Sequence, residues 1–348
     1  MLMKKKFAIV PTLKCPAKCD FCGFKSLFKK IPKSYLPLIM GSLKENSFYE
    51  ILKNKWKENP FLRMINGISG PYFLARVKRE IIDKVKLISP CELCYEYRKE
   101  TNFKNKYDFS GEISIEDFKN AMNDAKKLRF KEVVITGGGE PLIEYNKTLE
   151  IIRYANNKFK WVRLITNAYI FDSLQKSLRI VKELKESGLD SISVSTEFHP
   201  RYKFHQSFIQ LEKVRNLYLA CKKVGLSLNF ATLTTNDSSS INLNLSRLGK
   251  FINLKEFNIA TSWLAINRAK FSNRNFILIG CISRNFISEE RIDKEDFLSK
   301  NYISKDLTLY YNKLKNFILR PFGFSHILCF TPLIYPNGTV TVCCANFL

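Results

Sequence analysis

The sequence lacks any run of 18 or more consecutive apolar residues, which argues against a transmembrane helix. Its opening, MLMKKKFAIVPTLKC, imitates a signal peptide. However, the apolar run from Phe7 to Leu13 is short, contains Pro11 and has no small-residue cleavage site. We therefore expect this run to be a buried first strand, and we expect a cytoplasmic protein with no membrane partner.

Acidic residues are scarce: 32 Asp and Glu stand against 57 Lys and Arg, giving a formal net charge of +25. Such a charge permits binding to nucleic acid, including an RNA substrate. A binding surface requires the charge to gather on one face, whereas the lysines are scattered and their clusters are short. We therefore favour a general compositional bias and keep a nucleic-acid partner as the alternative.

The chain is long enough, at 348 residues with 45% hydrophobic content, for one large α/β barrel domain or two ordinary domains. From about residue 128, apolar runs rich in Val and Ile alternate with helical stretches, as in a parallel sheet covered on both faces. Together with FAIVPTL this predicts six strands. The fold class is therefore a partial, open (β/α)6 barrel similar to a TIM barrel, or a doubly wound sheet, with the working face at the carboxyl ends of the strands. The expected strands are 7–13, 131–136, 161–168, 190–198, 226–235 and 255–263, and the expected helices are 146–158, 172–188, 206–224 and 240–252.

Disulfides are not expected in a cytoplasmic chain, so its ten cysteines indicate metal or redox chemistry. The segment KCPAKCDFC places Cys15, Cys19 and Cys22 in a C-x3-C-x2-C pattern. Three thiolates on one short loop suit three irons of a 4Fe–4S cluster and leave the fourth iron open to a ligand. The alternative is a structural zinc site completed by the pair Cys91 and Cys94.

Two motifs together resemble those of the radical S-adenosylmethionine (SAM) superfamily. The first is the cysteine triplet with an aromatic residue, Phe21, before its last cysteine, directly after a predicted strand. The second is GGGEP at Gly137–Pro141, which ends the next predicted strand and resembles the GGE motif of that family. Glycine suits this place because backbone has to approach a ligand closely.

The resemblance implies roles for particular residues. Cys15, Cys19 and Cys22 would bind the 4Fe–4S cluster. Six residues would contact SAM: Phe21, Gly138, Gly139, Glu140, Asn167 and Ser195. Ordinary hydrogen bonding at strand ends is the alternative role for Asn167 and Ser195. A stretch after residue 195 also resembles members of the family, and it offers His199, Arg201 and His205 as further contacts. The catalytic residues beyond these stay unknown.

The spacing of the two motifs divides the chain. About 115 residues separate them, where one helix needs about 30. We therefore predict a core at 1–23 and 111–270, an insertion at 24–110 and a C-terminal extension at 271–348. The ending CFTPLIYPNGTVTVCC contains a PNG hairpin turn and resembles the start of a SPASM/twitch extension, although the downstream cysteines of a full extension are absent. A second 4Fe–4S cluster would then be held by Cys281, Cys329, Cys343 and Cys344.

The resemblance thus implies an enzyme that cleaves SAM reductively to a 5′-deoxyadenosyl radical, which abstracts hydrogen from a substrate. Such an enzyme requires an electron donor such as flavodoxin or ferredoxin. The tail suggests a peptide or protein substrate, and the positive charge leaves RNA as an alternative. From a different class, a zinc-stabilised nucleic-acid-binding protein would also explain the charge and the cysteines, but it leaves GGGEP unexplained. A degenerate member that binds the cluster without turnover is a third interpretation.

Overall fold

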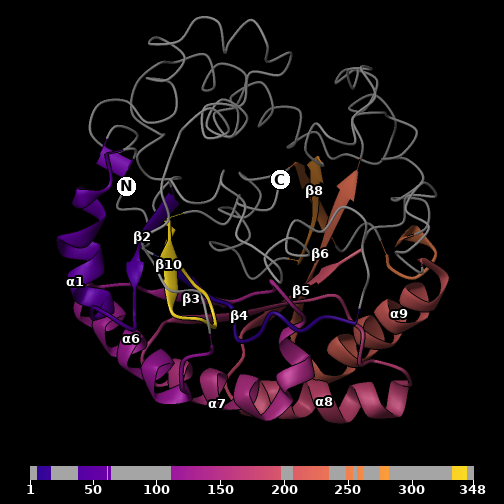
Figure 1. Cartoon of the computed structure of the whole chain (residues 1–348). Coiled ribbons are helices and arrows are strands. Elements are labelled where there is room, and N and C mark those ends of the chain that lie inside the picture. The colour runs from indigo at the N-terminus through magenta and orange to yellow at the C-terminus, as the bar shows by residue number, and fades with distance from the viewer. Residues whose placement is uncertain are drawn as a thin grey trace, which may run out of the picture.

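The computed structural model describes residues 6–16, 38–60, 62–63, 111–196, 207–234, 248–253, 257–261, 275–281 and 331–342. In these ranges the chain forms one mixed ten-stranded sheet with helices packed along it (Figure 1). The strands are β1 Lys6–Ile9, β2 Ile39–Ser42, β3 Glu132–Ile135, β4 Trp161–Thr166, β5 Ser191–Ser195, β6 Ser227–Thr234, β7 Phe257–Thr261, β8 Asn275–Cys281, β9 Leu333–Ile334 and β10 Thr339–Thr341. The helices are α1 Phe48–Lys53, α6 Ile115–Lys127, α7 Tyr145–Asn156, α8 Leu174–Glu186 and α9 Ser207–Val224, with short 3-10 helices η3 Lys55–Glu58 and η4 Pro141–Glu144.

The middle of the sheet is parallel, and it has the strand–helix alternation that the sequence predicts. The strands β1, β3, β4, β5 and β6 are neighbours in that order, and each pair runs parallel. The helices α6, α7, α8 and α9 lie in an arc along one side of it (Figure 1). Because the strands are parallel, the loops that follow β1, β3, β4 and β5 all leave the sheet at the same edge.

Beyond β6 the order differs from the prediction. The expected sixth strand, β7, does not pair with β6; β8 lies between them and pairs in parallel with both. The segment NFILIGC that forms β8 carries the same continuous apolar pattern as the other strands. The predicted boundary at 270 places this segment in the C-terminal extension.

On the other side, β1 is an interior strand. It pairs in parallel with β9, which forms the predicted PNG hairpin with β10, and β10 pairs antiparallel with β2. Segments of the predicted insertion and of the predicted extension therefore both contribute strands to the sheet that contains β1. The domain boundaries at 23, 110 and 270 stay a prediction.

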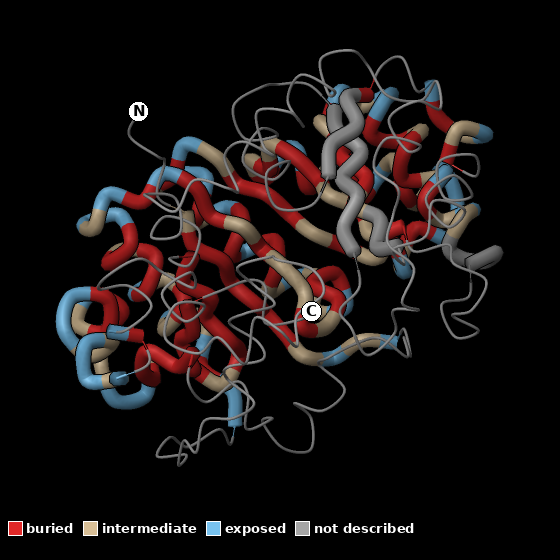
Figure 2. The backbone as a smooth tube through the Cα atoms, turned by 90° about the horizontal axis from the view of Figure 1, so that it is seen from above, coloured by how far each residue is buried: buried red, intermediate tan, exposed pale blue. Residues whose placement is uncertain are grey.

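The core lies between the sheet and the helices, where the buried stretches of backbone gather (Figure 2). Phe7 at the start of β1 is fully buried, and its ring centroid lies 5.5 Å from that of Phe130 and 5.3 Å from that of Phe159. Phe48 of α1 joins this cluster, with its centroid 5.8 Å from Phe7. The aromatic rings fix the amino-terminal ends of the strands and leave the opposite edge to polar residues.

The helices begin and end where their sequences indicate. Helix α6 starts with a capping box: the Ser114 side chain accepts a hydrogen bond from the Asp117 N–H, and the Asp117 carboxylate accepts one from the Ser114 N–H. Helices α8 and α9 end before Gly188 and Gly225, as predicted. Among the described helices, none is both long and apolar enough to cross a membrane.

Candidate functional site

Four of the predicted site segments meet at the carboxyl edge of the parallel strands. Cys15 follows β1, the glycine turn from Gly137 to Glu140 follows β3, Asn167 follows β4, and Ser195 is the last residue of β5. This is the edge at which α/β sheets bind ligands. The structure therefore brings together the described members of the predicted SAM and cluster site.

The cysteine loop and the glycine turn are joined through their backbones. The Gly139 N–H donates to the Thr12 carbonyl oxygen at 3.0 Å, and the Glu140 N–H donates to the Lys14 carbonyl oxygen at 2.8 Å. A side chain at position 139 has no room, since a Cβ there would lie 2.2 Å from the Lys14 carbonyl oxygen. Glycine is therefore required at 139 for the two loops to approach.

The Glu140 side chain holds the glycine turn to the end of β4. It is 1% exposed, and its carboxylate accepts hydrogen bonds from the Thr166 hydroxyl at 2.7 Å and the Asn167 N–H at 2.7 Å. It also accepts one from the Leu142 N–H at 3.1 Å, which caps η4. Burial raises the pKa of the Glu140 carboxyl to about 7, although these three hydrogen bonds favour its ionised form.

These contacts give Glu140 a structural role that the sequence does not predict. The family resemblance implies that this carboxylate contacts SAM, whereas the structure shows it buried and bonded to protein donors on β4 and η4. The contact with SAM stays a prediction. The sequence offers a weak signal for the structural role, because proline, here Pro141, is common at the first position of a helix and Thr166 ends the neighbouring apolar run.

Asn167 reaches the cysteine loop with its side chain. Its amide nitrogen Nδ2 lies 3.5 Å from the Cys15 sulfur Sγ, and its Oδ1 accepts a hydrogen bond from the Tyr169 N–H at 3.0 Å. Ala168 between them has a φ of 63°, in the left-handed region that glycine usually occupies. The turn after β4 is therefore bent sharply enough to aim the Asn167 amide back toward β1.

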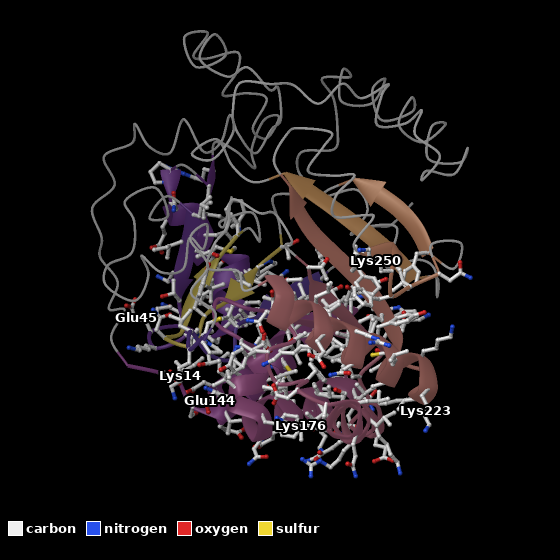
Figure 3. The ribbon with its side chains drawn as sticks, turned by 90° about the vertical axis from the view of Figure 1, so that its right-hand side faces the viewer. Lys14, Glu45, Glu144, Lys176, Lys223 and Lys250 are labelled. Carbon is white, nitrogen blue, oxygen red and sulfur yellow. The ribbon has the colours of Figure 1, made fainter. Side chains whose placement is uncertain are left out.

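An exposed ion pair lies beside this network. The Lys14 ammonium is 2.6 Å from the Glu144 carboxylate of η4, and both side chains lie together at the surface (Figure 3). The hydrogen bond to Glu144 raises the pKa of Lys14, and the same bond lowers the pKa of Glu144. Because both groups are solvated, we assign the pair little stabilising effect.

The remaining predicted residues fall into two groups. Gly138 is buried within the glycine turn, and Ser195, half-buried, is paired with Ala231 of β6. The other group lies outside the described residues: Phe21, Cys19, Cys22, Cys91, Cys94, His199, Arg201, His205, Cys329, Cys343 and Cys344.

Cys281 and Val342 lie at the ends of strands of opposite direction in the described sheet. Cys281 ends β8, whose carboxyl end lies at the same edge as Cys15 because β8 runs parallel to β6. Val342 follows β10, which runs antiparallel to β9 and therefore ends at the opposite edge. Six strands also lie between β10 and β8 in the strand order, and the two strands do not lie side by side in Figure 1. Cys329, Cys343 and Cys344 lie outside the described residues, so the second cluster stays a prediction.

The described residues fit one corner of a 4Fe–4S site. Cys15 is half-buried at the sheet edge, so its sulfur is sheltered but reachable. Thiolate is the ligand that iron–sulfur clusters prefer, and a nearby amide N–H is a usual partner of cluster sulfurs. Within the described ranges no group of three potential ligands gathers, as expected where Cys19 and Cys22 lie outside those ranges.

Open α/β sheets bind ligands outside the carboxyl ends of their strands, and the cysteine loop and the glycine turn are bonded to each other at that edge. Residues 89–236 match the family model of the Radical SAM superfamily. The matched segment contains the glycine turn, Asn167 and Ser195. It begins after the cysteine triplet.

Two solved structures are similar to the chain at a low level of sequence identity. A crystal structure of methylornithine synthase (PylB) is 11% identical, with a TM-score of 0.38, and the match covers 92% of this chain and 84% of that one. A crystal structure of oxaloacetate acetylhydrolase is 11% identical over 47% of this chain and 72% of that one, with a TM-score of 0.27. Among curated proteins no match was found. Likeness of this degree says nothing about substrate.

Proposed function

We propose that this protein is a radical SAM enzyme: it cleaves S-adenosylmethionine reductively to a 5′-deoxyadenosyl radical that abstracts hydrogen from a substrate. The observation that carries the proposal is the backbone pairing of the cysteine loop with the glycine turn, through Gly139 to Thr12 and Glu140 to Lys14. The match of residues 89–236 to the Radical SAM superfamily supports it independently, because that segment excludes the cysteine triplet.

Different residues of the chain would bind the cluster, contact SAM and position the loops. Cys15, with Cys19 and Cys22, would hold the 4Fe–4S cluster, and Gly138, Gly139 and Ser195 would contact SAM. When bound, the cluster supplies the electron that breaks the sulfonium–carbon bond of SAM. Glu140 keeps the β3 and β4 loops in fixed relation, so that the ligand-binding groups are arranged before SAM arrives. Phe21 would lie against the adenine.

We also propose an electron donor and a class of substrate. A small electron carrier such as flavodoxin or ferredoxin would reduce the cluster. For the substrate we propose a peptide or protein, because the PNG hairpin resembles the start of a SPASM/twitch extension. That hairpin is part of the main sheet, as β9 and β10, and a second cluster is not needed for the proposed reaction. RNA stays the alternative substrate.

The test is anaerobic reconstitution with iron and sulfide, followed by addition of SAM and dithionite. We expect about four irons for the triplet, an absorbance near 400 nm and formation of 5′-deoxyadenosine. The variants Cys15→Ala, Cys19→Ala and Cys22→Ala should each abolish the product. Cys221→Ala is the matched control, because Cys221 is buried in α9 away from the site. Undiminished product in a triplet variant would refute the assignment.

The same preparation distinguishes a radical SAM enzyme from the alternative class of protein. A zinc-stabilised nucleic-acid-binding protein would stay colourless, and its metal would be zinc by elemental analysis. RNA binding is measured separately, through its salt dependence. A log K that does not change with log salt concentration would exclude binding through phosphate contacts.

A further inference from the structure

We infer that Asn167 is a positioning residue for the cluster: its side-chain amide donates a hydrogen bond to the Cys15 sulfur and raises the reduction potential of the cluster. This inference rests on the proposed function, since it concerns the cluster that Cys15 would help to hold. It differs from the direct contact with SAM that the sequence predicts for Asn167. It is carried by the geometry of the turn after β4.

The direction of the amide is fixed by its second contact. An asparagine side chain can be turned over so that its oxygen and nitrogen exchange places, and its contacts decide which way it lies. The Tyr169 N–H is a donor, 3.0 Å from Oδ1, so the oxygen has to face it. The nitrogen Nδ2 is then left on the side of the Cys15 sulfur, 3.5 Å away, where a donor meets a thiolate acceptor.

The backbone of Asn167 is held as firmly as its side chain. Its N–H donates to Glu140 Oε2 at 2.7 Å, and Glu140 is itself buried. The Thr166 hydroxyl donates to the other carboxylate oxygen at 2.7 Å and accepts from the Ala168 N–H at 3.1 Å. The hydrogen bonds on both sides fix the orientation of the Asn167 amide, so little further conformational entropy is lost when it bonds to the sulfur. A contact that adjusts a reduction potential requires such a fixed donor.

The expected effect follows from charge. Reduction adds one negative charge to a cluster whose thiolate ligands share it. A hydrogen-bond donor aimed at a ligand sulfur stabilises the reduced form more than the oxidised form. Removal of that donor therefore favours the oxidised cluster. Dithionite or a flavodoxin would then reduce a smaller fraction of the enzyme.

The experiment measures the midpoint potential of the anaerobically reconstituted full-length protein by redox titration with electron paramagnetic resonance. The variant Asn167→Asp keeps an oxygen for the Tyr169 N–H and turns an acceptor toward the sulfur. We expect roughly a tenfold lower ratio of reduced to oxidised cluster at a fixed potential, which is about 59 mV for a one-electron couple. Asn216→Asp is the matched control, because the Asn216 amide donates instead to the Phe171 carbonyl oxygen.

A second measurement keeps the test decisive if the variant binds no iron. Wild-type protein labelled with 15N only at asparagine is reduced and examined by pulsed electron paramagnetic resonance. We expect a weak coupling between the cluster spin and an asparagine nitrogen. Its absence in wild type, or an unchanged potential in a fully loaded Asn167→Asp protein, would overturn the inference and leave the proposed function intact. Failure of the wild type to assemble any cluster would instead remove the proposed function.

Discussion

The Glu140 N–H donates a hydrogen bond to the Lys14 carbonyl oxygen, 2.8 Å away, and Lys14 directly precedes Cys15. This bond fixes the position of Cys15, the first residue of the cysteine triplet, relative to the glycine turn that follows β3. The same glutamate uses its carboxylate to hold the end of β4. Three loops at the carboxyl edge are thus tied to one residue, so changes there should move all of them together.

Replacement of Gly139 should disrupt the cysteine loop more than a typical glycine replacement. In Gly139→Ala the new methyl would meet the Lys14 carbonyl oxygen at 2.2 Å, so the two loops have to part. We expect a loss of about 2 kcal/mol or more in unfolding free energy, together with loss of iron binding. Denaturant unfolding and iron analysis measure the two effects.

Gly111→Ala serves as the comparison for that experiment. Gly111 has a φ of +68°, but a Cβ there would meet nothing within 4 Å. It should lose only about 1 kcal/mol from the unfavourable backbone conformation and retain iron. Equal behaviour of the two variants would contradict the close approach at Gly139.

Glu140 should lower the free energy of unfolding as the pH rises. An ordinary carboxylate in an ion pair has the opposite effect. Its pKa in the folded protein is about 7, above the ordinary value of 4.5, so the folded protein binds the proton more tightly. Its contribution is therefore fully present below about pH 4.5 and is lost as the pH rises through 7, by at most about 3 kcal/mol. Denaturant unfolding of apoprotein between pH 4.5 and 8 tests this.

The variants isolate that contribution. Glu140→Gln should remove the decrease in unfolding free energy with rising pH. The difference in unfolding free energy between wild type and variant, plotted against pH, therefore gives the contribution of Glu140. Glu144→Gln is the control: Lys14 lowers the pKa of Glu144, so its stabilisation is lost instead as the pH falls, and solvent exposure keeps it small. A wild-type curve parallel to that of Glu140→Gln would mean that Glu140 does not titrate as described.

Ala168 should tolerate glycine but not a β-branched residue. Its φ of 63° is unfavourable for any residue with a Cβ, and it is fully buried. In Ala168→Gly the relief of the backbone is offset by greater freedom of the unfolded chain, so stability should stay within about 1 kcal/mol of wild type. Ala168→Val should lose about 2 to 3 kcal/mol. Thermal unfolding distinguishes the two, and a stable valine variant would mean that the turn adopts another conformation.

Ile334 should behave as a core residue of the whole sheet. It is fully buried in β9 and paired with Ile9 of β1, so Ile334→Ala should lower the unfolding free energy by about 2 to 4 kcal/mol. Ile143 offers a matched control, since it is 37% exposed and Ile143→Ala should change stability by less than about 0.5 kcal/mol. If the C-terminal segment were an independent unit, Ile334→Ala would leave the main unfolding transition unchanged.

The sequence predicts the local elements well because their signals are local. Apolar runs and helix-ending glycines identify β3 to β6 and α7 to α9 close to their observed bounds. The pairing of β9 with β1 leaves no such signal, because parallel pairing between segments at opposite ends of a chain depends on the whole fold. The same reason explains why β8, an ordinary apolar run, was not predicted to lie between β6 and β7.

The candidate site also has a part that the sequence predicts and a part that it does not. Motif spacing identifies Cys15 and the glycine turn, because ligand chemistry restricts the residue types in those places. It does not identify the hydrogen bonds of Glu140 with Thr166 and Asn167, because those partners come from another strand whose register only the fold determines. The positions of Cys19 and Cys22 relative to this network stay predictions.

The position of β9 has a consequence for biosynthesis. Ala8 leaves the ribosome long before Leu333, with which it pairs. Until then one side of β1 has unpaired backbone groups that could join a strand of another nascent chain. Such a late and distant pairing also slows folding. We therefore expect the yield of soluble protein to depend on chaperones during synthesis, even where the finished protein is stable.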